Sequence, residues 1–90
     1  MKSDFHLDPR ITFLNHGSYG ATPKSILEEQ RNWQQKMEEG PVHFMRRILP
    51  NAILEAKTKV GNFIGANAKD ISFVQNATMG VNAVLLSVPC

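Results

Sequence analysis

The sequence predicts an α/β segment with an incomplete sheet. Its pattern runs strand, helix, helix, strand, helix over 90 residues. Parallel strands need a crossover connection, and here only two short strand candidates are available to form a pair. The helices carry apolar faces that two short strands cannot cover. We therefore expect the front end of a larger α/β domain rather than a complete one.

The first strand is expected at residues 11–14 (ITFL), after an irregular arm of ten residues. Its β-branched and aromatic residues favour a strand. The next segment, 15–22 (NHGSYGAT), gathers small and turn-forming residues. Gly17 and Gly20 are expected to allow backbone angles that other residues avoid.

A helix is expected from Thr22 to about Glu39. Thr22 suits the N-cap and Pro23 the first helical position. The pair Gly40-Pro41 ends the pattern. The face expected to pack carries Ile26, Leu27, Gln30, Trp33 and Met37.

Residues 42–49 are expected to add a further turn or two of helix. Pro50 then marks the start of another helix that runs to about Ile64, with Gly65 as its stop. The apolar stripe of this helix is Ile53, Leu54, Val60, Phe63 and Ile64.

The second strand is expected at residues 70–75 (DISFVQ), which contain a short apolar run. A polar turn follows at 76–78 (NAT), and residues 79–88 have helical spacing. The apolar side of this last helix is Val81, Val84, Leu85 and Val88.

The charge, hydropathy and cysteine content of the chain exclude several classes of function. A net charge of +2 is too weak to indicate nucleic acid or an anionic membrane as a partner. No apolar stretch approaches the roughly 20 residues of a membrane span, and the first ten residues lack a signal-peptide core. The single cysteine, Cys90, excludes an internal disulfide, and no metal-ligand spacing occurs. We expect a soluble cytoplasmic protein.

The segment Asn76-Ala77-Thr78 is the most informative local feature. A helix start exposes unpaired N–H groups, and its dipole favours negative charge. A phosphate seated there would gain hydrogen bonds from the backbone and from the Thr78 hydroxyl. The alternative is a plain N-cap on a helix that binds nothing.

The loop Asn15-His16-Gly17-Ser18-Tyr19-Gly20 is the second candidate. It places an amide, an imidazole, a hydroxyl and a phenol on one turn, and such loops often carry function. The alternative is a tight turn whose polar groups satisfy the local backbone. Arg46 and Arg47 could clamp a carboxylate, although paired arginines more often form a solvated face.

Three separated segments together resemble one family. FLNHGSYGATP (13–23), GPVHFMRR (40–47) and DISFVQNATMGVN (70–82) resemble the N-terminal part of class V aminotransferase enzymes, of the isopenicillin N epimerase-like group. The resemblance covers residues 7–88. It implies a fold type I pyridoxal phosphate (PLP) enzyme, that is, an aspartate aminotransferase-like transferase fold.

The resemblance also implies roles for residues. Thr78 would meet the cofactor phosphate, with main-chain contact from Ala77 and with Asn76 opening the helix. The segment Asn15 to Ser18, including His16 and Gly17, would help to form the substrate side of the active site. Residues 1–21 would be the arm and active-site loop, 22–64 the helices, and 70–90 the start of the cofactor-binding domain.

The chain departs from the family in one important respect. The family uses a Schiff-base lysine, and a carboxylate on the pyridine nitrogen, that lie much later in its sequences. None of the lysines here matches that position, so we expect the segment to be inactive alone. The resemblance implies a parent enzyme, dimeric when complete, that acts on amino acids or amines by transamination, epimerisation or C–S/β-elimination. The competing interpretation is a small helical interaction module that uses the Trp33 face.

Overall fold

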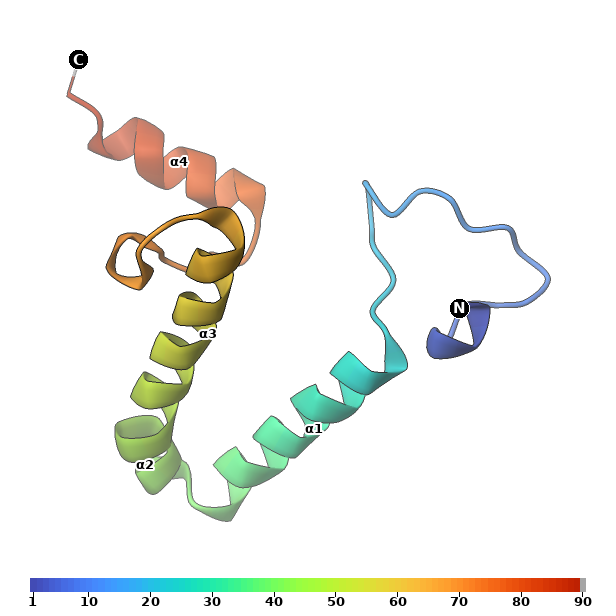
Figure 1. The fold of residues 1–90 in the computed structure, drawn as a ribbon, viewed down its shortest axis with the longest axis horizontal. Helices are drawn as coiled ribbons and strands as arrows, with labels where there is room; N and C mark the ends of the chain where they lie inside the picture. Colours follow the sequence, from blue (N-terminus) through green and yellow to red (C-terminus); the bar gives the residue numbers. More distant parts are fainter. Residues whose placement is uncertain (90) are drawn as a thin grey trace. The chain divides into compact units, whose positions relative to one another are not determined.

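A computed structural model describes residues 1–89, which are mostly helical (Figure 1). The long helices are α1 (Lys24–Glu39), α3 (Leu49–Ile64) and α4 (Ala77–Ser87). The short helical segments are η1 (Lys2–Asp4), α2 (Pro41–His43), η2 (Phe44–Ile48) and η3 (Ala68–Asp70). The chain divides into two compact units, residues 1–48 and the residues from Leu49 onward, and each is described by itself.

Neither expected strand is present within residues 1–89. Residues 11–14 and 71–75 are irregular, and Asp70 ends the short helix η3. The single β-bridge in this range pairs Phe5 with Pro23 in antiparallel fashion. A strand needs a neighbouring strand to satisfy its backbone N–H and C=O groups. Since residues 1–89 supply no such neighbour, the expectation of two strands is wrong for the described chain.

Helix α1 begins one residue later than expected. Pro23, rather than Thr22, is the N-cap, with φ −57° and ψ 145°. The Pro23 carbonyl oxygen accepts the first helical hydrogen bonds, from the N–H groups of Ile26 and Leu27 at 3.1 Å each. The bridge to Phe5 explains the shift, because it holds Pro23 in an extended conformation outside the helix.

The end of α1 packs on the segment that follows it. Helix α1 ends at Glu39, as expected, and the chain turns at Gly40 into α2 and then η2, a π-helical turn. Phe44 is 5% exposed and is the one buried apolar side chain in the described chain. Its ring lies 6.2 Å from the Trp33 ring at an edge-on angle of 68°. The Lys36 ammonium lies 4.6 Å from the Trp33 ring centroid, within range of a cation–π contact.

Helix α3 ends at Gly65, which has a positive φ of 77°. The N–H groups of Gly65 and Ala66 both donate to the Gly61 carbonyl oxygen, at 2.8 and 2.9 Å. This left-handed C-terminal turn is the standard way in which glycine ends a helix. The expectation that Gly65 stops this helix is confirmed, while the helix starts at Leu49, one residue before Pro50.

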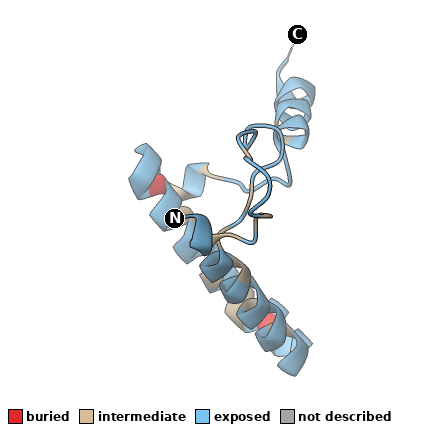
Figure 2. Cartoon of the chain, turned by 90° about the vertical axis from the view of Figure 1, so that its right-hand side faces the viewer, coloured by how far each residue is buried: buried red, intermediate tan, exposed pale blue. Residues whose placement is uncertain are grey.

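Most of the helical chain is coloured as exposed (Figure 2), and many of its apolar side chains share this exposure. Val84 and Leu85 of α4 are 61% and 68% exposed, and Phe63 of α3 is 91% exposed. The apolar stripes expected from the sequence are therefore present but uncovered. Over the described residues, no helix has both the length and the apolar content that membrane crossing requires.

Candidate functional site

The first candidate site is the start of α4. Asn76 is the N-cap, with φ −162° and ψ 170°, and its side-chain Oδ1 accepts a hydrogen bond from the Met79 N–H at 2.9 Å. The Asn76 carbonyl oxygen accepts from the Gly80 N–H at 3.2 Å. Ala77 and Thr78 therefore occupy the first and second helical positions. Neither of their N–H groups has an acceptor among residues 1–89.

This arrangement corrects the expected turn at 76–78. The helix starts at Ala77 instead of residue 79, because the Asn76 side chain already caps it. Thr78 is consequently not a cap. Its hydroxyl belongs to the first helical turn, next to two N–H groups that have no partner in the described chain.

The electrostatics of this turn suit an anion. The first turn of α4 contains no acidic residue, and the helix dipole places partial positive charge there. A phosphate group could take hydrogen bonds from the Ala77 and Thr78 N–H groups and from the Thr78 hydroxyl. The donor set at the start of α4 therefore fits the phosphate of PLP.

The second candidate site is the loop at residues 15–21. Asn15 organises it: Oδ1 accepts from the Ser18 N–H at 3.3 Å, and the Asn15 carbonyl oxygen accepts from the Tyr19 N–H at 3.4 Å. The polar groups of the loop thus do satisfy the local backbone, as in an Asx turn. The Ser18 hydroxyl is on the exposed side of this turn, with no hydrogen bond to residues 1–89.

His16 is held by three contacts. Its Nδ1 accepts a hydrogen bond from the Ala21 N–H at 3.2 Å. The Phe13 ring meets the imidazole edge-on, with centroids 4.6 Å apart at 89°. The Phe5 ring lies 6.5 Å away at 51°. His16 is therefore the side chain of this loop with the most contacts that fix its position.

The glycines of this loop do not use left-handed backbone angles. Within residues 1–89, Gly65 is the one residue with positive φ, so the expectation for Gly17 and Gly20 is wrong. A Cβ added at Gly17 would meet nothing within 4 Å, whereas one at Gly20 would lie 3.4 Å from the His16 carbonyl oxygen. Both positions therefore have room for a Cβ atom.

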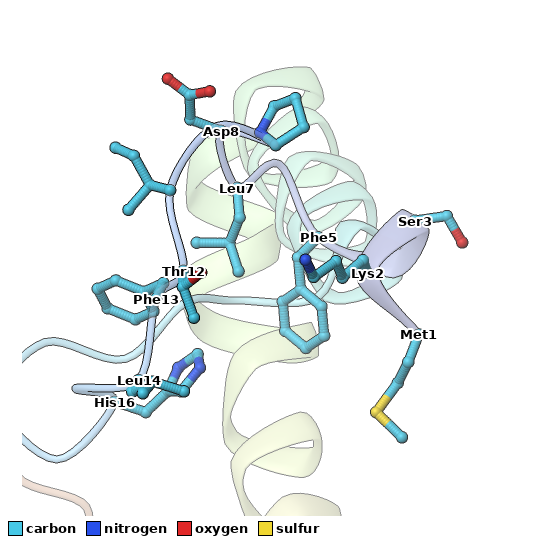
Figure 3. A pocket seen from close by; sticks show the side chains of 12 residues that line it. Met1, Lys2, Ser3, Phe5, Leu7, Asp8, Thr12, Phe13, Leu14 and His16 are labelled. Carbon is cyan, nitrogen blue, oxygen red and sulfur yellow. The ribbon is translucent and has the colours of Figure 1, made fainter.

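An apolar pocket of about 490 Å³ lies beside this loop (Figure 3). Its walls include the side chains of Phe5, Leu7, Phe13 and His16, together with Lys2. The arm 1–14 therefore encloses space next to His16. Residues 13–16 are not helical, so the spacing of Phe13 and His16 in the sequence did not indicate their contact.

Asp8, which lines this pocket, forms an ion pair with Arg10. Their side chains are bidentate, with Nη2–Oδ2 at 2.7 Å and Nε–Oδ1 at 3.0 Å, and the Arg10 N–H also donates to Oδ1 at 2.9 Å. The Arg10 guanidinium lowers the pKa of Asp8 below its ordinary value, and the backbone N–H adds to this effect. Sequence reasoning missed this pair, although acidic and basic residues two positions apart around Pro9 are a usable signal.

The weaker candidates remain exposed. Arg46 and Arg47 lie on the π-helical turn η2 without a carboxylate partner in the described chain. No cluster of three metal-ligating side chains occurs among residues 1–89. Cys90 lies outside the described residues. The α4 start and the His16 loop belong to different units, and each site stands on its own geometry.

No family model matches the chain. Curated proteins nevertheless match it over nearly its whole length. Isopenicillin N epimerase of Amycolatopsis lactamdurans is 34% identical over 82 residues, which are 91% of this chain and 20% of that protein. L-cysteine desulfhydrase of Arabidopsis thaliana is 34% identical over 84 residues, 92% of this chain and 18% of that protein.

A third relative is more distant but covers more of the chain. Hercynylcysteine sulfoxide lyase of Schizosaccharomyces pombe is 28% identical over 89 residues, 99% of this chain and 23% of that protein. The chain spans about a fifth of the length of the curated relatives it matches. Over about nine tenths of its length the chain is thus similar to isopenicillin N epimerases and L-cysteine desulfhydrases, and its resemblance to this group of the class V aminotransferase family is confirmed.

Proposed function

We propose that this chain is a segment of a PLP-dependent enzyme that acts on an amino acid, and that the start of α4 binds the cofactor phosphate. One observation carries the proposal: Asn76 caps α4 so that the N–H groups of Ala77 and Thr78 stay available beside the Thr78 hydroxyl. Three donors at a helix start without acidic residues are what a phosphate requires.

The reaction class follows from the relatives. Their printed names describe an epimerase, a desulfhydrase and a sulfoxide lyase. Epimerisation and C–S bond cleavage both break a bond within the amino-acid substrate. The electron pair left on the substrate carbon must then be delocalised. When bound, PLP supplies this electron sink. Transamination uses the same electron sink, so it is the names of the relatives that favour these two among the subtypes expected from the sequence.

The residues of this chain would hold and orient the reactants. Ala77 and Thr78 would hold the phosphate end of the cofactor. Asn76 would cap the helix through the Met79 N–H and so leave the N–H groups of Ala77 and Thr78 available. Asn15, His16, Gly17 and Ser18 would contribute to the substrate side. The uncovered apolar faces of α3 and α4 are consistent with a larger protein around this segment, and we propose a homodimeric, cytoplasmic enzyme.

Selective labelling tests the phosphate site. In the intact polypeptide that carries this segment, freed of cofactor and labelled with 15N-threonine, PLP and inorganic phosphate should both shift the Thr78 amide signal, while pyridoxal, which lacks the phosphate, should not. Thr12, Thr22 and Thr58 serve as references in the same spectrum. A Thr78 signal that phosphate leaves unchanged, or that pyridoxal moves equally, contradicts the assignment.

The interaction-module alternative receives less support. It needs the Trp33 face to be available to a partner. In the structure the Trp33 ring packs on Phe44 and lies under the Lys36 ammonium, and its exposure is only intermediate. The indole thus serves the internal packing of α1 on η2.

A further inference from the structure

We draw no further inference here: the strongest candidate, the apolar pocket enclosed by the arm at residues 1–14, lies against the loop at residues 15–21 already described, and nothing in the structure shows what covers its apolar wall.

Discussion

Replacing Gly61 by alanine places a Cβ against the backbone carbonyl oxygen of Ala66, closer than real Cβ atoms come. The turn that ends α3 must then shift. That turn depends on two hydrogen bonds into the Gly61 carbonyl oxygen, from the Gly65 and Ala66 N–H groups. We expect Gly61→Ala to open the end of α3.

Gly80→Ala is the matched control, because it makes the same change inside α4. A Cβ at Gly80 would lie 3.4 Å from Cγ2 of Val74, an ordinary contact. Both substitutions gain about 1 kcal/mol of helix propensity, so this term cancels between them. Loss of two hydrogen bonds at about 0.5–1.5 kcal/mol each leaves Gly61→Ala less stable than Gly80→Ala by roughly 1–3 kcal/mol.

Hydrogen exchange followed by mass spectrometry measures this difference locally. Since 1.4 kcal/mol corresponds to a factor of ten, protection at Gly65 and Ala66 in the intact polypeptide that carries this segment should be roughly five- to 150-fold lower in Gly61→Ala than in Gly80→Ala. Gly80→Ala should leave those amides unaffected and should slow exchange in α4. Equal protection of the Gly65 and Ala66 amides in both variants would refute the steric reasoning.

Three further outcomes follow from the structure. Because Phe44 is the one buried apolar side chain in the described residues, the chain alone should melt without a sharp cooperative transition, and calorimetry that shows a two-state monomer contradicts this. Incubation with PLP should label its lysines slowly and unselectively; stoichiometric labelling of one lysine, abolished only by replacing that residue, would show otherwise. The turn in which the Asp8 carboxylate accepts hydrogen bonds from Arg10 should be stable above the ordinary aspartate pKa. It should be lost as pH falls through the lowered pKa of Asp8. In Arg10→Gln the Asp8 midpoint, read from its 13C carboxyl shift, should rise, and an unchanged midpoint speaks against the ion pair.

Features governed by neighbouring residues could be predicted from the sequence. Gly40 and Gly65 end helices where expected, since a helix end depends on a few adjacent residues. The apolar spacing along α3 and α4 also identified both helices. The motifs at 13–23, 40–47 and 70–82 were sufficient to indicate the family.

Features that depend on distant partners could not be predicted. Residues 11–14 have strand composition, but a strand also needs a neighbour to pair with. The start of α1 moved because Phe5 bridges to Pro23, eighteen positions away. At α4 the starting residue was the error, because the helix begins at Ala77 and not at residue 79. Both Asn76 and Thr78 suit an N-cap, and only the hydrogen bond from the Met79 N–H identifies Asn76. Likewise, the orientation of His16 depends on Ala21, Phe13 and Phe5 together.

The central claim is that the start of α4 binds the cofactor phosphate, and Thr78→Val in the intact polypeptide that carries this segment tests it most directly. The change removes one donor and nearly conserves volume. A hydrogen bond to a charged group contributes about 1.5–3 kcal/mol, so PLP should bind roughly ten- to a hundred-fold more weakly. Thr58→Val is the control, because the Thr58 hydroxyl donates only to the Leu54 carbonyl oxygen within α3, at 2.8 Å. The account predicts a raised PLP dissociation constant in Thr78→Val alone, with the melting temperature of the apo-protein nearly unchanged; a dissociation constant in Thr78→Val equal to that of Thr58→Val would contradict it.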